Sequence, residues 1–274
     1  MLWYHYPLLF SVALAAGAIN SVAGGGTLLT FPTLLWTGLV ERIANATSTV
    51  ALWPGQLSSF WGYRSEIGRQ YATILALAVP SFLGGWLGAT LLVRSRDDTF
   101  AAIVPYLVLI ATCLFMAQEP LGRWLAAREN RLGSPGAEPS DIPDPSSFPF
   151  SPFRWAALLV YQFFVAIYGG YFGAGIGILM LAGFGFLGLT NIHQMNGLKN
   201  INGMCINAVA AAMFIVERLV DWPAALVMAA GAIVGGYAGA GTARRIGQRN
   251  VRRLVVVIGL ALSILLLVRR LSLG

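Results

Sequence analysis

A single lysine lies inside an apolar stretch in the second half of the chain. Lys199 is the only lysine among 274 residues, and all eleven Asp and Glu residues fall at the ends of apolar segments or between them. An uncompensated cation inside a bilayer is unfavourable by at least about 2.5 to 3.5 kcal/mol. We therefore expect its partner to be an anionic ligand. Two alternatives remain: the ammonium group snorkels to the membrane surface from a segment that begins near residue 193, or the amine is neutral.

Polar residues accompany this lysine on one face of a predicted helix. They follow the spacing i, i+3, i+4 and i+11, and they are Asn196, Lys199, Asn200 and Asn207. The positions 151 residues earlier in the chain are polar as well, and they hold Asn45, Ser48, Thr49 and Gln56. These two stripes are predicted to face one another across a binding site. The alternative is that the amides and hydroxyls only hydrogen-bond between helices and hold the bundle together.

Two glycine-rich runs interrupt the apolar sequence at matching places in the two halves. The first run is AGGGT at 23–27, which contributes Gly24, Gly25, Gly26 and Thr27, and the second is GAGIG at 173–177, which contributes Gly173, Gly175 and Gly177. Glycine allows the backbone to open, and the N-terminus of the following half-helix then attracts anions through its free N–H groups and its dipole. We therefore predict that both runs line the anion site. Close helix packing is the alternative role for these glycines.

The elements that must position these residues are membrane helices. Hydrophobic residues make up 57% of the chain and charged residues 11%, whereas soluble domains have about 25% charged residues. The net charge of +7 comes from arginines in short gaps between apolar runs, which the positive-inside effect explains without nucleic acid as a partner. The composition therefore predicts an all-α, polytopic integral membrane protein whose surroundings are the lipid bilayer.

The apolar segments form two sets of five. The first set covers about 7–22, 27–40, 43–63, 70–93 and 99–118, and the second covers 153–172, 176–189, 193–216, 222–242 and 251–268. The last three segments of each set have the length of full spans, whereas the second segments are too short and are predicted to be broken or re-entrant. The chain therefore divides into a first repeat at 1–118, a proline-rich polar linker at 119–152 and a second repeat at 153–274.

The orientation of the two repeats follows from the arginines. If each repeat crosses the membrane an odd number of times, the repeats are inverted, and eleven arginines share one face while six lie on the other. A parallel arrangement gives eight against nine, which carries no bias. The positive-inside rule therefore favours inverted repeats in the plasma membrane, with both termini outside the cell. Such repeats with interrupted helices are typical of transporters that bind their substrate near the bilayer midplane.

Several sequence runs carry a resemblance to a known family. AGAINSVAGGGTLLTFP at 16–32, ANATST at 44–49, YGGYFGAGIG at 168–177 and NGLKN at 196–200 resemble the sulfite exporter TauE/SafE family of membrane permeases. The resemblance implies a secondary transporter of sulfur-containing oxyanions such as sulfite or organosulfonates, working in the export direction without a bound cofactor. Thr47 joins the predicted substrate site only through this resemblance.

Two other functions remain open at this stage. One is an uptake permease for thiosulfate, a carboxylate or another small solute, and the other is a membrane assembly protein that does not transport. The sequence has no Walker A, GxSxG or HExxH motif and only two histidines, so we expect no catalytic residues and no metal site. The oligomeric state is left open.

Overall fold

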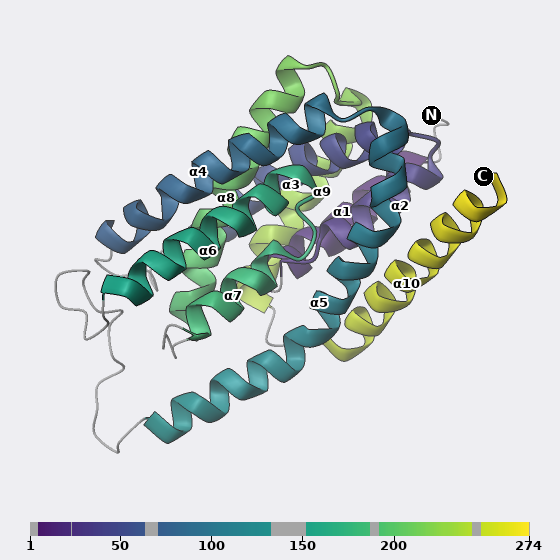
Figure 1. Cartoon of the computed structure of the whole chain (residues 1–274). Helices are drawn as coiled ribbons and strands as arrows, with labels where there is room; N and C mark the ends of the chain where they lie inside the picture. The colour runs from purple at the N-terminus through teal and green to yellow at the C-terminus, as the bar shows by residue number, and fades with distance from the viewer. Residues whose placement is uncertain are drawn as a thin grey trace.

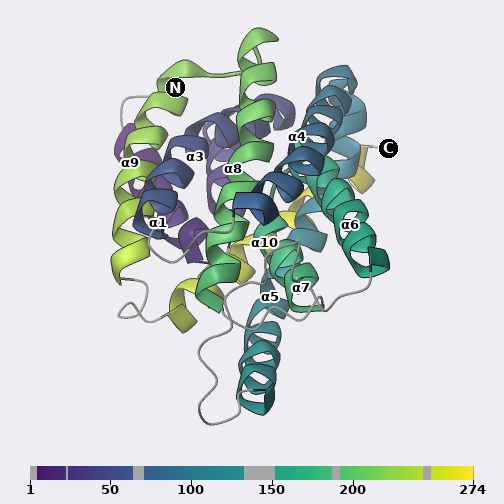
Figure 2. The same cartoon turned by 90° about the vertical axis from the view of Figure 1, so that its left-hand side faces the viewer.

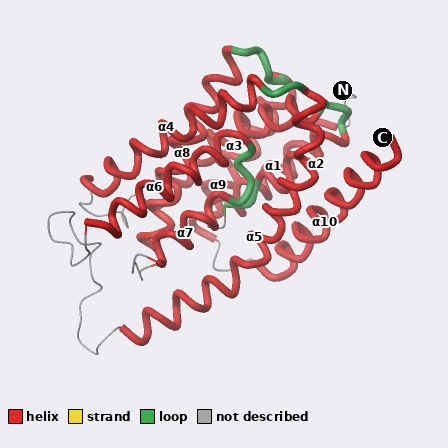
Figure 3. The backbone as a smooth tube through the Cα atoms, viewed as in Figure 1, coloured by secondary structure: helices red, strands yellow, loops and turns green. Residues whose placement is uncertain are grey.

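The computed structural model describes residues 5–22, 24–63, 71–132, 152–186, 192–242 and 248–273. These residues form ten α-helices and no strand (Figures 1 and 3). In chain order the helices are α1 His5–Val22, α2 Thr27–Trp36, α3 Glu41–Tyr63, α4 Tyr71–Arg94, α5 Asp97–Leu132, α6 Pro152–Tyr171, α7 Ile176–Phe186, α8 Ile192–Val216, α9 Trp222–Thr242 and α10 Gln248–Leu273. The predicted all-α class is confirmed, and each predicted apolar segment corresponds to one helix.

Four of these helices are long and apolar enough to cross a membrane. The apolar stretches are Thr73–Arg94 in α4, Asp97–Ala117 in α5, Met195–Val216 in α8 and Trp222–Gly239 in α9. The other two predicted spans are α3 and α10. Helix α3 has 23 residues, but its polar stripe lowers its hydropathy, and the apolar stretch found in α10 is Val256–Val268.

The short second helix of each half turns back along the first. The rings of His5 and Trp36 lie 5.3 Å apart, so α2 ends where α1 begins. In the second half, the Tyr161 hydroxyl of α6 donates to the Leu179 carbonyl of α7 over 2.8 Å, and a Cβ on Gly183 would also meet the Tyr161 ring. Both pairs are therefore helical hairpins, and the re-entry of the short segments into the membrane stays a prediction.

In each half, the first helix packs against the fourth helix of the other half. Helix α1 packs on α9, and its counterpart α6 packs on α4. The repeated glycines make both contacts close: Gly84 and Gly88 of α4 face backbone atoms of α6, and Gly235 and Gly239 of α9 face those of α1. Figure 2 places α8 between the group α1, α3 and α9 on one side and the pair α4 and α6 on the other. The internal repeat is thus visible in the contacts between helices.

Helices α3 and α8 cross at the centre of this arrangement. The Trp53 indole N–H of α3 donates to the Met204 carbonyl of α8 over 3.3 Å. These two positions are 151 residues apart, so they are equivalent positions of the two repeats. The crossing of α3 and α8 therefore brings matching positions of the two halves together.

Helix α5 continues well past its predicted span. It ends at Leu132, so the predicted linker 119–152 starts inside a helix, and residues 133–151 of that linker lie outside the described part of the chain. Arg64, Arg69, Arg244 and Arg245, which entered the orientation argument, lie outside it as well. In Figure 1, α1 begins and α10 ends at one end of the bundle, whereas α5 ends and α6 begins at the opposite end.

An arginine ties three helices together at the end of the bundle where α3 begins. Arg42 Nε lies 2.6 Å from an Asp97 carboxylate oxygen at the start of α5. Arg42 Nη1 also donates to the carbonyls of Val93 and Ser95 at the end of α4, over 3.2 and 3.0 Å. Carbonyls at a helix C-terminus lack donors of their own helix. The guanidinium therefore closes this end of α4 and joins it to α3 and α5.

The glycine contacts between α4 and α6 yield a stability test. A Cβ on Gly88 would overlap the Ile167 carbonyl and lie 2.8 Å from the Tyr171 nitrogen, both backbone atoms that cannot rotate away. We expect Gly88→Ala to lower the free energy of unfolding in detergent by about 1 to 3 kcal/mol. The matched control is Gly203→Ala, since no atom lies within 4 Å of a Cβ on this helical glycine. Equal destabilisation by both variants would contradict the packing role.

Candidate functional site

Lys199 is buried and points at the end of α1. Its side chain is 3% exposed, and its Nζ donates to the Ser21 carbonyl over 3.3 Å. Ser21 lies in the last turn of α1, where carbonyls have no intrahelical donor and the helix dipole is negative. The amine is therefore enclosed by protein, which argues against the snorkelling alternative and leaves the charged and the neutral amine as its two possible states.

A buried polar network holds another face of α8. The Ser81 hydroxyl of α4 lies 3.0 Å from Asn202 Oδ1 of α8 and accepts a hydrogen bond from Gln162 Nε2 of α6 over 2.9 Å. All three side chains are fully buried. Such a network has a defined geometry because unpaired amides are unfavourable in a core. It fixes α8 against α4 and α6, and thereby fixes Lys199, one turn before Asn202.

The two glycine-rich breaks meet beside Lys199. Gly24 in the first break has a φ of 75°, and Gly173 and Gly175 in the second each have 81°, a conformation that other residues rarely adopt. A Cβ on Gly24 would lie 2.8 Å from the Cα of Gly177, in the first turn of α7. Gly24, which follows the end of α1, therefore packs directly against the beginning of α7. Only glycine permits this close contact.

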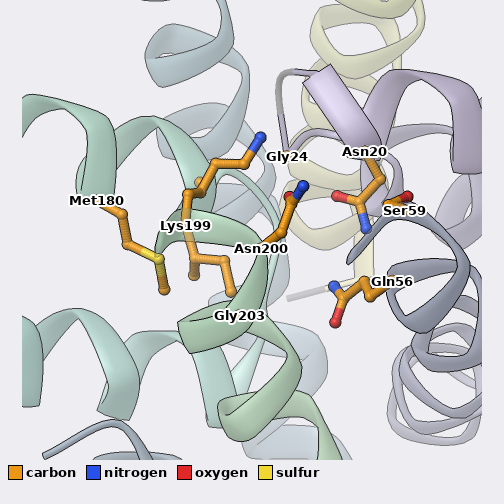
Figure 4. Close-up of a pocket in the computed structure, with 10 residues that line it drawn as sticks. Asn20, Gly24, Gln56, Ser59, Met180, Lys199, Asn200 and Gly203 are labelled. Carbon is orange, nitrogen blue, oxygen red and sulfur yellow. The ribbon is translucent and has the colours of Figure 1, made fainter. Parts of the chain in front are cut away.

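A cavity of about 20 Å³ lies where these elements converge (Figure 4). Its lining comes from the α1 end and its break, from α3, from the beginning of α7 and from α8: Asn20, Gly24, Gln56, Ser59, Ile176, Gly177, Met180, Lys199, Asn200 and Gly203. This volume is enough for about one water molecule. A larger ligand therefore enters only when the surrounding helices separate.

Amide groups form much of the polar lining. The side-chain ends of Asn20, Gln56 and Asn200 point toward one another, and the Gln56 nitrogen faces α8 (Figure 4). Asn200 is 6% exposed, and its Nδ2 has no hydrogen-bond partner among the described residues. An unpaired buried donor is unfavourable unless a ligand satisfies it. The Asn200 amide is therefore a candidate contact for a ligand oxygen.

The beginning of α7 adds backbone donors to the same cavity. Ile176 and Gly177 form its first turn, where N–H groups lack intrahelical acceptors and the dipole is positive. None of the ten described residues that line the cavity is Asp or Glu. Nor does any group of three or more His, Cys, Asp or Glu in the described part of the chain lie close enough to hold a metal ion. An ammonium group, free amide N–H groups and a helix N-terminus together can bind an anion.

Five of the predicted site residues line this cavity, and eleven do not. Those that line it are Gly24, Gln56, Gly177, Lys199 and Asn200. The others are Gly25, Gly26, Thr27, Asn45, Thr47, Ser48, Thr49, Gly173, Gly175, Asn196 and Asn207. Two of these glycines are sites of tight packing: a Cβ on Gly25 would overlap the Phe115 ring, and one on Gly26 would lie 2.7 Å from the Ala16 carbonyl.

The four predicted residues in the first half of α3 hydrogen-bond within the protein. Asn45 Nδ2 donates to the Tyr171 carbonyl over 3.1 Å, and Thr49 donates to the Asn45 carbonyl over 3.0 Å. The Thr47 hydroxyl accepts from the Asp221 backbone N–H at 3.0 Å. The hydroxyls of Ser48 and Thr30 are 2.6 Å apart. The Asn45 contact mirrors that of Lys199. Asn45 of α3 contacts the end of α6 in the second half, and Lys199 of α8 contacts the end of α1 in the first half.

The two polar stripes run in opposite directions at the helix crossing. Gln56 of α3 shares the cavity with Lys199 and Asn200 of α8, and Trp53 contacts Met204, so rising residue numbers on α3 meet falling numbers on α8. The helices are therefore antiparallel. Asn45 precedes Gln56 by eleven residues, or roughly 16 Å along a helix. One cavity lies at one end of the crossing, and the single site made of two facing stripes stays a prediction.

Three polar or flexible residues of the cavity were absent from the predicted site. Asn20 lies in the last turn of α1, four residues before Gly24, and Ser59 continues the Gln56 face of α3 at i+3. Both could have been found by extending the two patterns by one helical turn. Met180 lies one turn into α7 and carries no sequence signal that separates it from a core residue.

Comparison with known proteins adds to this geometry. The profile described as Sulfite exporter TauE/SafE matches residues 9–266. A "Probable membrane transporter protein" of Haemophilus influenzae is 29% identical over 258 residues, which cover 93% of this chain and 92% of that protein. The "Probable membrane transporter protein YfcA" of Escherichia coli K12 is 28% identical over 268 residues, which cover 95% and 88%. No solved structure matches significantly.

The profile match runs through both hairpins, the α3–α8 crossing and the cavity, and the alignments with the two relatives, each named a probable membrane transporter protein, cover most of their length. A small solute and a lipid environment follow from that membership. This multi-pass helical chain belongs to the sulfite exporter TauE/SafE family of membrane transporters.

Proposed function

We propose that the protein is a secondary transporter that exports small sulfur-containing oxyanions, such as sulfite or organosulfonates, across the plasma membrane. The observation that carries this proposal is the buried Lys199 ammonium, placed beside the first turn of α7 and an unpaired Asn200 amide in a cavity that no carboxylate lines. Substrate oxygens accept from these donors. The TauE/SafE family description supports the sulfur oxyanion as the substrate class.

Export needs no further energy source in this proposal. An anion that leaves a cell with a negative interior gains about 2.3 kcal/mol per charge per 100 mV. A coupled cation pump would instead need acidic ligands inside its spans, and the eleven Asp and Glu residues fall outside the apolar segments. The membrane potential alone is therefore a sufficient driving force.

We infer that the two repeats are inverted in the membrane. Each hairpin returns to the face from which it starts, and three further helices follow it in each half, which gives an odd number of crossings. The positions of the α1 start and the α10 end at one end of the bundle, opposite the α5 end and the α6 start, support this topology (Figure 1). Inverted repeats provide alternating access by exchanging two related conformations.

A buried aromatic contact occupies the counterpart of the cavity in the other half, which supports alternating access. Phe31 of α2 occupies the position equivalent to Met180 of α7, 149 residues earlier. Its ring packs edge-on against Phe172 at 5.5 Å, and both side chains are 1% exposed. In the exchanged conformation this aromatic contact opens while the cavity beside Lys199 closes.

Removing the buried charge tests the anion site directly. We expect Lys199→Met to lower sulfite efflux from loaded proteoliposomes at least about tenfold, which corresponds to about 1.4 kcal/mol, because the ligand loses its ionic partner. Ser11→Ala is the control, since Ser11 is exposed and its hydroxyl contacts only the Pro7 carbonyl of its own helix. Size-exclusion profiles establish that both variants are folded. Unchanged efflux in Lys199→Met would remove the charge argument.

The wild-type protein separates the alternative functions in the same assay. Flux that runs only inward under either sign of the imposed potential would favour an uptake permease for thiosulfate, a carboxylate or another small solute. Absence of both flux and oxyanion binding would favour a membrane assembly protein without transport.

Gly24 tests the contact between the breaks. We expect Gly24→Ala to abolish sulfite flux, because alanine is disfavoured at a φ of 75° and its Cβ would press on the Gly177 backbone. Gly38→Ala is the matched control: this glycine also has a positive φ, of 95°, but its Cβ position is open. If Gly38→Ala abolishes flux as fully as Gly24→Ala, backbone strain and not the Gly177 contact explains the loss.

Cysteine labelling tests the topology. In a background without Cys113 and Cys205, we expect a membrane-impermeant thiol reagent added to intact cells to label Ser95→Cys and Glu217→Cys but not Ser140→Cys in the linker. Inverted repeats with both termini outside place the first two positions on the outer face. Labelling of Ser95→Cys without labelling of Glu217→Cys would support parallel repeats.

A further inference from the structure

We infer that the cavity beside Lys199 selects ligands with a single negative charge, an inference that rests on the proposed anion transport and names its substrate class. The ten lining residues contain one basic side chain and no acidic one. No arginine is among them, and Arg42 is engaged with Asp97 at the end of the bundle. One ammonium group is therefore the whole formal charge that the described residues of the lining offer.

The helix ends around the cavity do not change this balance. The first turn of α7 carries about half a positive charge, and the last turn of α1, where Ser21 accepts from Lys199, carries about half a negative charge. The two contributions offset one another. The field at the cavity is thus close to that of one cation, and a dianion would keep one negative charge without a partner in a buried site.

The lining is also polar on one side only. Asn20, Gln56 and Ser59 lie on one side of Lys199, whereas Met180 lies on the other (Figure 4). Ile176 adds to the apolar part of the lining. An uncharged substituent such as a methyl group fits against the side chains of Met180 and Ile176, which themselves offer a second charged oxygen no N–H or O–H donor. Shape and charge therefore favour the same class, a monoanion with its oxygens at one end.

A matched pair of probes separates charge from shape. Methanesulfonate and sulfate share a tetrahedral sulfur and a similar size, but methanesulfonate carries one negative charge and a methyl group where sulfate carries a second charged oxygen. We expect methanesulfonate to bind the purified wild-type protein at least about tenfold more tightly than sulfate. Binding is measured by thermal stabilisation at constant ionic strength, at low millimolar concentrations where the general salting effect of sulfate is absent.

A charge-shifted variant makes the inference sharper. Lys199→Met lacks the ammonium group, so we expect this variant to prefer a ligand with one negative charge fewer. Neutral dimethyl sulfone is then expected to stabilise the variant at concentrations that leave the wild-type protein unchanged. If this variant does not fold, the comparison of methanesulfonate with sulfate on the wild-type protein decides alone.

The possible results distinguish this inference from the proposed function. Sulfate that binds as tightly as methanesulfonate, or more tightly, overturns the single-charge inference and leaves anion transport standing. If neither probe binds and sulfite does not bind either, the anion site itself is wrong, and with it both proposals. Lys199→Met can also keep the full wild-type preference for methanesulfonate over sulfate. In that case the apolar lining causes the selectivity, and the inference that the single ammonium charge causes it is wrong.

Discussion

The contact between the Lys199 ammonium and the Ser21 carbonyl is the interaction on which the arrangement depends. A cation buried at 3% exposure needs partners, and the protein offers it the end of a helix instead of a carboxylate. That partner exists only because α1 stops inside the bundle, and α1 stops there because Gly24 turns the chain with a positive φ. A continuous first helix would bond its own carbonyls and leave the ammonium alone.

The scaffold is repeated, whereas the chemistry is not. Both halves form a hairpin, exchange glycine-mediated contacts and hold the end of a first helix with a side chain of the opposite third helix, through Asn45 in one case and Lys199 in the other. The polar residues Ser81 and Asn202, however, occupy positions whose counterparts 151 residues away are Ala232 and Ala51. The two ends of the α3–α8 crossing therefore differ: one has the cavity beside Lys199, and the other has the Phe31–Phe172 contact.

Sequence reasoning located the elements and the central residue but not the final geometry. Segment lengths and glycine positions predicted all ten helices, and the lone lysine pointed to the cavity, because both depend on local physics. Helical periodicity defines which face Asn45 and Gln56 share, but it does not define which part of α3 meets α8. That register follows from the antiparallel crossing at Trp53 and Met204, which depends on packing across 151 residues of chain.

The site also constrains how transport can proceed. In the proposed function, a substrate oxygen and the Ser21 carbonyl compete for the same ammonium group, since both accept from Lys199 Nζ. A cavity of about 20 Å³ admits a substrate only if the α1 end and the start of α7 move away from α8. These requirements coincide, because the movement that enlarges the cavity also releases the ammonium from Ser21. Substrate then replaces the contact that holds the first hairpin to α8, so binding and hairpin movement are coupled through one cation.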